Sequence, residues 1–150
     1  MDQREYDKNM KKLAIIIGTR PEGIKLAPII NAARSKFNQH IEPIIIATGQ
    51  HTNLLDDVFT LFNIASDYTL SITRETHLLS ELQAQLTTSL EQLFKQIQPD
   101  IVMVQGDTLS TLSGAMAAFY QKIPIAYVES GLRSGDLYAP FPEEANRLMV

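Results

Sequence analysis

The sequence predicts an α/β fold: a doubly wound, mainly parallel sheet with helices on both faces. Apolar runs of strand length alternate with stretches of helical period, which is typical of βαβ units. The apolar runs have no polar face, as expected of strands that helices cover on each side. Four of these runs end in polar, glycine-bearing turns. In a parallel sheet such turns line one crevice, so we expect the chemistry of the chain to be gathered there.

The strands are expected at residues 13–17, 41–47, 101–104 and 123–128, with a weaker one at 68–72. Residues 1–12 precede the first strand and are polar and mixed in charge, without the apolar segment of a secretory signal. We expect them to be a disordered lead-in to a Rossmann-like domain that covers residues 13–150.

The first helix should begin at Pro21, because the missing N–H of proline costs nothing at a helix start. Its apolar face is predicted to consist of Ile24, Pro28, Ile29, Ala32 and Ala33. The second helix should cover residues 54–62 and turn five apolar side chains inward: Leu54, Leu55, Val58, Leu61 and Phe62.

A longer helix is expected from about His77 to residue 97, because apolar side chains recur every three or four residues from Leu78 onward, and it should end at Pro99. The next helix should begin at Thr108 or Leu109 and pack closely on the sheet through small residues. After a loop at 131–142, a last helix is expected over 142–147, and the sequence ends inside it. We therefore expect the chain to be the front part of a longer polypeptide, whose second domain supplies the opposite wall of the crevice.

Composition narrows the class of protein. The chain has 150 residues, about one domain, with 45% apolar and 20% charged residues and no tract apolar enough to span a bilayer. It has no cysteine, which fits a reducing compartment, and we expect a soluble, cytoplasmic protein. The net charge of −4 argues against a nucleic-acid surface. The three histidines and the carboxylates show no metal-ligand spacing, so no metal site is predicted.

The turn after the first strand is a candidate anion site. Backbone N–H groups of residues 18–20 and the following helix start could meet a phosphate or diphosphate, with Arg20 and Lys25 adding positive charge. The turn is neither a Walker loop nor a dinucleotide-binding turn. A plain surface turn with a solvated Lys25 is the alternative.

Carboxylates follow the later strands. Asp107 could act as an acid, a base or a helix cap, although Thr108 could fill the capping role. Glu129 follows a strand end, where burial would neutralise a lone carboxylate unless Arg133 or Lys25 compensates; a structural ion pair is the alternative to a functional role.

Residues at two helix starts are less specific. Glu143 and Glu144 lie in the first turn of the last helix, where the dipole favours acidic residues, so spacing alone favours a solvated helix start. His51 could begin a helix or face the crevice.

Taken in order, five motifs resemble those of the non-hydrolysing UDP-N-acetylglucosamine 2-epimerases: Gly18-Thr19-Arg20-Pro21-Glu22-Gly23-Ile24-Lys25, Gly49-Gln50-His51, Gln105-Gly106-Asp107-Thr108, Val128-Glu129-Ser130-Gly131-Leu132-Arg133 and Pro142-Glu143-Glu144-Ala145-Asn146-Arg147. The resemblance covers about residues 12–150, the amino-terminal domain of a two-domain enzyme similar to the GT-B glycosyltransferases. In that family the carboxy-terminal domain binds much of the UDP and contributes a catalytic histidine, and it is not part of this sequence.

The resemblance implies a cofactor-free interconversion of UDP-GlcNAc and UDP-ManNAc, through elimination of UDP, a 2-acetamidoglucal intermediate and re-addition of UDP. It makes Asp107, Glu129 and Glu143 the acid/base carboxylates, without saying which takes which proton, and Lys25 an essential cation. The positions that it implies for substrate binding are Arg20, at the nucleotide, Gln50, His51, Arg133 and Arg147. Members of the family are commonly homodimers.

Some residues depart from the family pattern. Tyr127 stands where histidine is usual, Ser130 where alanine is usual, and Gln105 where histidine is common, which leaves room for another N-acetylated UDP sugar. Many bacterial members bind a second UDP-GlcNAc as activator, through positions that match Gln50 and Glu144. A glutamine of the family is Asn53 here, which puts that regulation in doubt.

Two other classes of function remain open. A hydrolysing relative, which releases free ManNAc, usually carries Arg-Ala-Asp where this chain has Arg20-Pro21-Glu22, and this counts against it. A non-catalytic nucleotide-sugar-binding module is disfavoured by the intact set of carboxylates and Lys25. For the 150 residues alone we expect no activity and at most weak binding of UDP.

Overall fold

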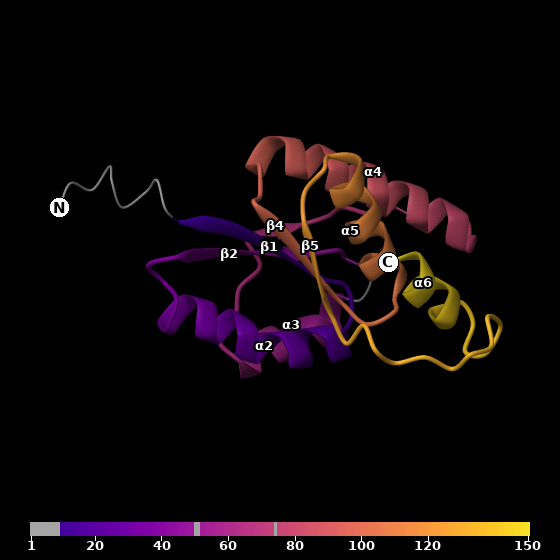
Figure 1. Ribbon diagram of the computed structural model, residues 1–150, viewed down its shortest axis with the longest axis horizontal. Coiled ribbons are helices and arrows are strands. Elements are labelled where there is room, and N and C mark those ends of the chain that lie inside the picture. Colours follow the sequence, from indigo (N-terminus) through magenta and orange to yellow (C-terminus); the bar gives the residue numbers. More distant parts are fainter. Residues whose placement is uncertain (1–9, 50–51, 74) are drawn as a thin grey trace.

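A computed structural model describes residues 10–49, 52–73 and 75–150 (Figure 1). Its centre is a five-stranded parallel sheet in the order β3-β2-β1-β4-β5. The strands are β1 (Lys11–Ile17), β2 (Ile41–Ala47), β3 (Tyr68–Thr69), β4 (Ile101–Gln105) and β5 (Ile125–Val128). The predicted parallel α/β sheet is therefore confirmed.

Helices cover both faces of the sheet, as predicted. Helices α2 (Arg20–Ser35) and α3 (Thr52–Leu61) lie on one face, and α4 (Leu79–Ile97) and α5 (Leu109–Tyr120) lie on the other (Figure 1). The short α6 (Glu143–Met149) contacts α5. None of the described helices is long and apolar enough to cross a membrane.

The alternation of side chains along each strand builds two separate cores. In β1, Ile15 and Ile17 pack with α2 and α3, whereas Ala14 and Ile16 pack with α4 and α5. Successive side chains of a strand point to opposite faces, so both must be apolar when both faces are covered.

The chain reverses its direction across the sheet between β1 and β4, which are neighbours with Leu13 opposite Ile101. From β1 the chain passes through α2 to β2 on one side, and from β4 it passes through α5 to β5 on the other. This is the switch point at which open α/β sheets bind their ligands, outside the carboxyl ends of the strands.

Only the strand expected at 41–47 has the predicted bounds: the weak strand expected at 68–72 ends at Thr69, the one expected at 101–104 extends to Gln105, and the first and last strands begin at other residues than expected. The first strand begins at Lys11, so the last two residues of the expected lead-in belong to the sheet; residues 1–9 lie outside the described residues. Lys11 and Lys12 pair with Ile41 and Glu42 of β2, and the side chain of Asp100 accepts further hydrogen bonds from Lys12 N and Lys11 Nζ, both at 2.9 Å. The last strand begins at Ile125 rather than at residue 123, and the N–H of Ile123 bonds to the end of α5 instead.

The predicted inner face of α2 is confirmed for Ala33 and in part for Ile29, which packs against the core, and is wrong for Ile24 and Pro28. The buried positions are Glu22, Gly23, Leu26, Ala27, Ile30 and Ala33, whereas Ile24 and Pro28 are exposed and Ile29 and Ala32 are half-buried. The buried stripe is centred on Leu26, Ala27 and Ile30, which pack in the core on this face of the sheet. Glu22 lies on the same buried side, held by hydrogen bonds from its own turn.

Smaller corrections concern α3 and α4. Leu55 and Val58 are buried as predicted, but Leu61 is 76% exposed and Phe59 is buried instead; the side chain of Leu54 is outside the described part of the chain. Leu78 is exposed because it precedes the first turn of α4, which begins at Leu79. That helix does end before Pro99, through Gln98 in the left-handed conformation.

Candidate active site

A cleft of about 160 Å³ opens at the carboxyl ends of β1 and β4. It is lined by Thr19, Pro21, Glu22, Lys25, Gln105, Gly106, Asp107, Thr108, Glu129 and Arg147. Four of the site residues predicted from the sequence, Lys25, Asp107, Glu129 and Arg147, therefore come together although they are far apart in the chain. The expectation that the strand-end turns share one crevice is confirmed for the turns after β1, β4 and β5, which contribute Thr19, Asp107 and Glu129.

Lys25 and Glu129 form an ion pair through Nζ and Oε2. Gln105 Nε2 donates to the same carboxylate oxygen at 2.6 Å. The hydrogen bond from Lys25 holds the pKa of Glu129 below its ordinary value, against the opposing effect of burial. Glu129 is thus a carboxylate at neutral pH, and Lys25, not Arg133, is the partner that it needs.

The backbone of Glu129 is unusual, with φ at +67°. This is the left-handed region, which a residue with a side chain seldom adopts. Backbone strain of this kind clusters at functional sites, because the surrounding structure must hold it in place.

Arg147 connects two of the carboxylates of the cleft, Asp107 and Glu129. Its Nη2 lies 2.5 Å from Asp107 Oδ2 and 3.4 Å from Glu129 Oε1, and its Nη1 donates to the carbonyl of Glu129 at 3.0 Å. Asn146, also on α6, donates to the carbonyl of Asp107 at 2.7 Å. Helix α6 is therefore fastened to the turns after β4 and β5.

Asp107 has no capping role, as the sequence suggested it need not. Thr108 caps α5 by accepting a hydrogen bond from Thr111 N at 3.2 Å. Tyr127 contributes more than packing, because its hydroxyl donates to the carbonyl of Gly106 at 2.7 Å and so fixes the turn that carries Asp107.

Sequence reasoning missed Glu22 as part of the site. It is 2% exposed and lines the cleft, and its Oε2 accepts hydrogen bonds from Gly18 N at 2.5 Å and Thr19 N at 2.9 Å. The spacing of Thr19 and Glu22 is that of a capping box, a signal that was visible in the sequence. Because Glu22 accepts hydrogen bonds from these two N–H groups, they are not free to bind an anion, and the expectation that the backbone of this turn binds one is wrong for Gly18 and Thr19.

Glu144 corrects another expectation. It is not a solvated helix start but 2% exposed, and it accepts hydrogen bonds from Arg133 Nε at 2.8 Å and Ser134 N at 3.0 Å. The Arg133 hydrogen bond is the main cause of its low pKa of about 2. Arg133 and Glu144 thus fasten the loop after β5 to α6, and neither lines the cleft.

The remaining predicted residues lie elsewhere. Arg20 is exposed at the start of α2, and Glu143 is half-buried at the start of α6; neither lines the cleft. In the described part of the chain, Oε2 of Glu143 is buried without a hydrogen-bond partner. Gln50 and His51 lie outside the described residues.

Over residues 10–49, 52–73 and 75–150, no group of three or more His, Asp or Glu side chains is placed to hold a metal ion.

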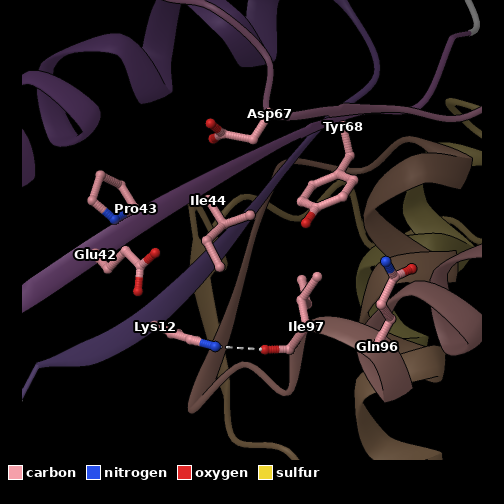
Figure 2. A pocket seen from close by; sticks show the side chains of 8 residues that line it. All are labelled: Lys12, Glu42, Pro43, Ile44, Asp67, Tyr68, Gln96 and Ile97. Atoms are coloured by element: carbon pink, nitrogen blue, oxygen red, sulfur yellow. Dashed lines mark hydrogen bonds between the residues drawn. The ribbon is translucent and has the colours of Figure 1, made fainter. Parts of the chain in front are cut away.

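A larger cavity, of about 340 Å³, lies at the opposite edge of the sheet. Figure 2 shows its lining, from the amino ends of β1 and β2, the segment around β3 and the end of α4, with Lys12 Nζ donating to the carbonyl of Ile97 at 3.1 Å. None of the predicted site residues lines it, and Asp67 is engaged by the backbone N–H of Ile45 at 2.7 Å. The smaller cleft is therefore the candidate active site.

A family model described as UDP-N-acetylglucosamine 2-epimerase matches residues 33–150. The chain belongs to this family. The UDP-N-acetylglucosamine 2-epimerase of Salmonella typhimurium is 44% identical over 139 residues, which cover 93% of this chain and 36% of that protein. The Escherichia coli K12 enzyme of the same name is 45% identical over 140 residues, with 93% and 36% covered. The chain thus spans about a third of the length of these relatives.

Solved structures of epimerases share the fold. The UDP-GlcNAc 2-epimerase from Neisseria meningitidis, solved bound to UDP-GlcNAc, superposes with a TM-score of 0.87 at 43% identity, over 92% of this chain and 37% of that one. The epimerase from Methanocaldococcus jannaschii, in complex with UDP-GlcNAc and UDP, gives 0.82 at 41% identity, with 92% and 37% covered. MurG from Acinetobacter baumannii, at 23% identity and 0.61, over 87% and 37%, shows a likeness of fold alone. The domain is the Rossmann-like half of the GT-B architecture that these epimerases share.

Proposed function

We propose that the chain is the amino-terminal domain of an enzyme that interconverts UDP-GlcNAc and UDP-ManNAc without hydrolysing them. The observation that carries the proposal is the cluster of Lys25, Asp107, Glu129 and Arg147 at the switch point of the sheet. It combines carboxylates that can move a proton with cations that can face a diphosphate, and epimerisation at C2 with departure of UDP needs both.

The reaction proceeds in two halves. A carboxylate removes the proton from C2, the C1–O bond to UDP breaks with its electron pair staying on the diphosphate, and a C1–C2 double bond forms. A carboxylic acid then delivers a proton to the other face of C2 while the UDP oxygen re-forms its bond to C1. Nothing is consumed, so no cofactor is needed for balance.

The residues of the cleft suit these steps. Lys25 keeps Glu129 ionised, which suits a proton acceptor in the resting enzyme. Lys25 and Arg147 place positive charge beside the carboxylates, where a departing diphosphate would need it. Asp107, Glu129 and Glu143 are the acid/base candidates, and the assignment of each proton among them is left to experiment.

The size of the cleft suggests that a second domain completes the site. Ligand pockets usually enclose roughly 300–1,000 Å³, and this cleft holds about 160 Å³. A nucleotide sugar would therefore need another wall, and the relatives are nearly three times as long as this chain.

Product analysis tests the proposal. The complete polypeptide that carries this chain should convert UDP-GlcNAc to UDP-ManNAc, read by chromatography or NMR, while residues 1–150 alone should convert none. Free ManNAc as the product would assign the hydrolysing reaction instead. Binding of UDP-GlcNAc without any product would leave a nucleotide-sugar-binding module and contradict the proposal.

A further inference from the structure

Glu22 lies where two turns of the cleft meet. Its Oε2 is held by the N–H groups of Gly18 and Thr19, in the turn after β1. Its Oε1 accepts the hydroxyl of Thr108, in the turn after β4, at 2.5 Å. A single carboxylate thus joins the two loops that flank the switch point.

Helix capping accounts for only half of this arrangement. A capping box needs the bond from the glutamate to the start of its own helix, which Thr19 N supplies. The bond to Thr108 has no part in capping α2, because Thr108 belongs to the start of α5. The second bond is therefore a tie between elements that are 86 residues apart in the chain.

Two threonine hydroxyls lie beside Glu22, those of Thr108 and Thr111, and each has one proton to donate. Thr111 gives its one proton to the carbonyl of Gln105 at 2.6 Å and lies 3.4 Å from Glu22 Oε1. Thr108 therefore makes the main contact, giving its proton to Glu22 and accepting one from Thr111 N. These two hydrogen bonds restrict the rotation of the Thr108 side chain.

Glu22 is buried without a charged partner in the described part of the chain, which makes its ionised form costly. Among the described residues, no lysine, arginine or histidine forms an ion pair with it, and every donor that it meets is neutral. Burial raises the pKa of Glu22, and the hydrogen bonds from Thr108, Gly18 and Thr19 only partly oppose this.

We propose that Glu22 is a positioning residue of the active site, and that its tie between the two turns fixes Lys25 relative to Asp107. Lys25 follows Glu22 by one turn of α2, and Asp107 directly precedes Thr108. If the tie is cut, the Lys25–Glu129 pair and the Asp107–Arg147 pair can shift against each other. The kinetic part of this inference rests on the proposed epimerase activity.

The kinetic test compares two substitutions in the complete polypeptide. Glu22→Ala removes the tie. The expected result is a loss in kcat of about 10- to 100-fold, as for a displacement of catalytic groups by about 1 Å. The change in KM should be smaller. Glu22→Gln should restore kcat to within about threefold of the parent, because its carbonyl can accept from Gly18 and Thr19 and its amide can donate to Thr108. Glu42→Ala, at an exposed position of β2, is the matched control.

Two kinetic outcomes would overturn the inference. If Glu22→Ala lowers the unfolding temperature but leaves kcat unchanged well below that temperature, Glu22 serves stability alone. If Glu22→Gln is as inactive as Glu22→Ala while folded, the residue acts through its proton or charge and is not a positioning residue.

A readout that needs no activity separates this inference from the proposed function. In hydrogen exchange on the complete polypeptide, Glu22→Ala should accelerate exchange both at residues 18–19 and at the segment around Thr111 N, which depends on Thr108. Faster exchange at residues 18–19 alone would mean that the turns are not tied, and would overturn the inference. If the parent protein turns over no UDP sugar, the proposed function fails, but this measurement still decides the role of Glu22.

Discussion

Arg147 Nη2 contacts two carboxylates at once, Asp107 Oδ2 at 2.5 Å and Glu129 Oε1 at 3.4 Å. Asp107 follows β4 and Glu129 follows β5, so one guanidinium on α6 neutralises acidic groups from two strand ends. Without such a cation, neighbouring carboxylates would repel and one of them would take up a proton. The arrangement places two carboxylates from different strand ends side by side on one cation.

Replacing Arg147 by methionine should impair catalysis strongly. Methionine keeps much of the length but removes the charge, and loss of one preorganised electrostatic contact typically costs about 10²-fold or more in rate. The expected result is a fall of about 10²-fold in kcat/KM, measured for the UDP-GlcNAc to UDP-ManNAc conversion. Arg34→Met, at an exposed position late in α2, should have no comparable effect. Equal activity of the two variants would remove Arg147 from the site.

Lys25→Met should raise the pKa of Glu129. The hydrogen bond from Lys25 is the main cause of its lowered pKa, and burial acts in the opposite direction. Without Lys25, Glu129 should take up its proton at higher pH than in the parent protein. Carboxyl-carbon NMR titration, with the Glu129 signal assigned by its absence in Glu129→Gln, measures this shift. A titration that does not move would mean that the ion pair is absent in solution.

Glu144 should make stability depend on pH in the acid range. Its pKa is about 2 in the folded chain against an ordinary value of 4.5, chiefly through Arg133. A depressed pKa contributes stability that is fully present above about pH 4.5 and is lost as pH falls toward 2. Glu144→Gln should therefore flatten the decline of the unfolding free energy between these values, measured by urea unfolding at several pH values. Glu42→Gln is the control. If the unfolding free energy of Glu144→Gln declines with falling pH as steeply as that of the control, the Arg133–Glu144 contact does not stabilise the fold.

Gly18→Ala should destabilise the fold through a steric clash. A Cβ at this position would lie 2.0 Å from Ser110 Oγ and 2.7 Å from Thr48 Oγ1, whose hydroxyls are 2.9 Å apart. Forcing an extra methyl group into a packed interior typically costs about 1–3 kcal/mol, which denaturant unfolding resolves. Gly131→Ala is the control, because its Cβ would meet nothing within 4 Å and its stability should not fall.

Local patterns predicted the sheet and much of the site. Strand 41–47 was located to the residue because its apolar run is bounded by polar turns on both sides. Lys25, Asp107 and Glu129 were expected at one crevice because parallel strands end at a common edge, and that rule needs no knowledge of side-chain contacts.

What the sequence did not predict depends on contacts between distant segments. The buried face of α2 is defined by the packing of Leu26, Ala27 and Ile30 against the core. The burial of Glu22 includes a contact with Thr108, 86 residues away. The burial of Glu144 and the double contact of Arg147 follow from the path of the loop at 131–142, which has no periodicity to read.

The most direct test of the central claim is proton exchange at C2 during turnover. The complete polypeptide is incubated with UDP-GlcNAc in D₂O, beside a Glu129→Gln variant, and the products are examined by NMR. We expect deuterium at C2 of the UDP-ManNAc formed by the parent protein, and a large loss of both product and label in the variant. UDP-ManNAc formed without deuterium at C2, or full labelling by Glu129→Gln, would contradict the assignment of this cleft as the site of proton transfer.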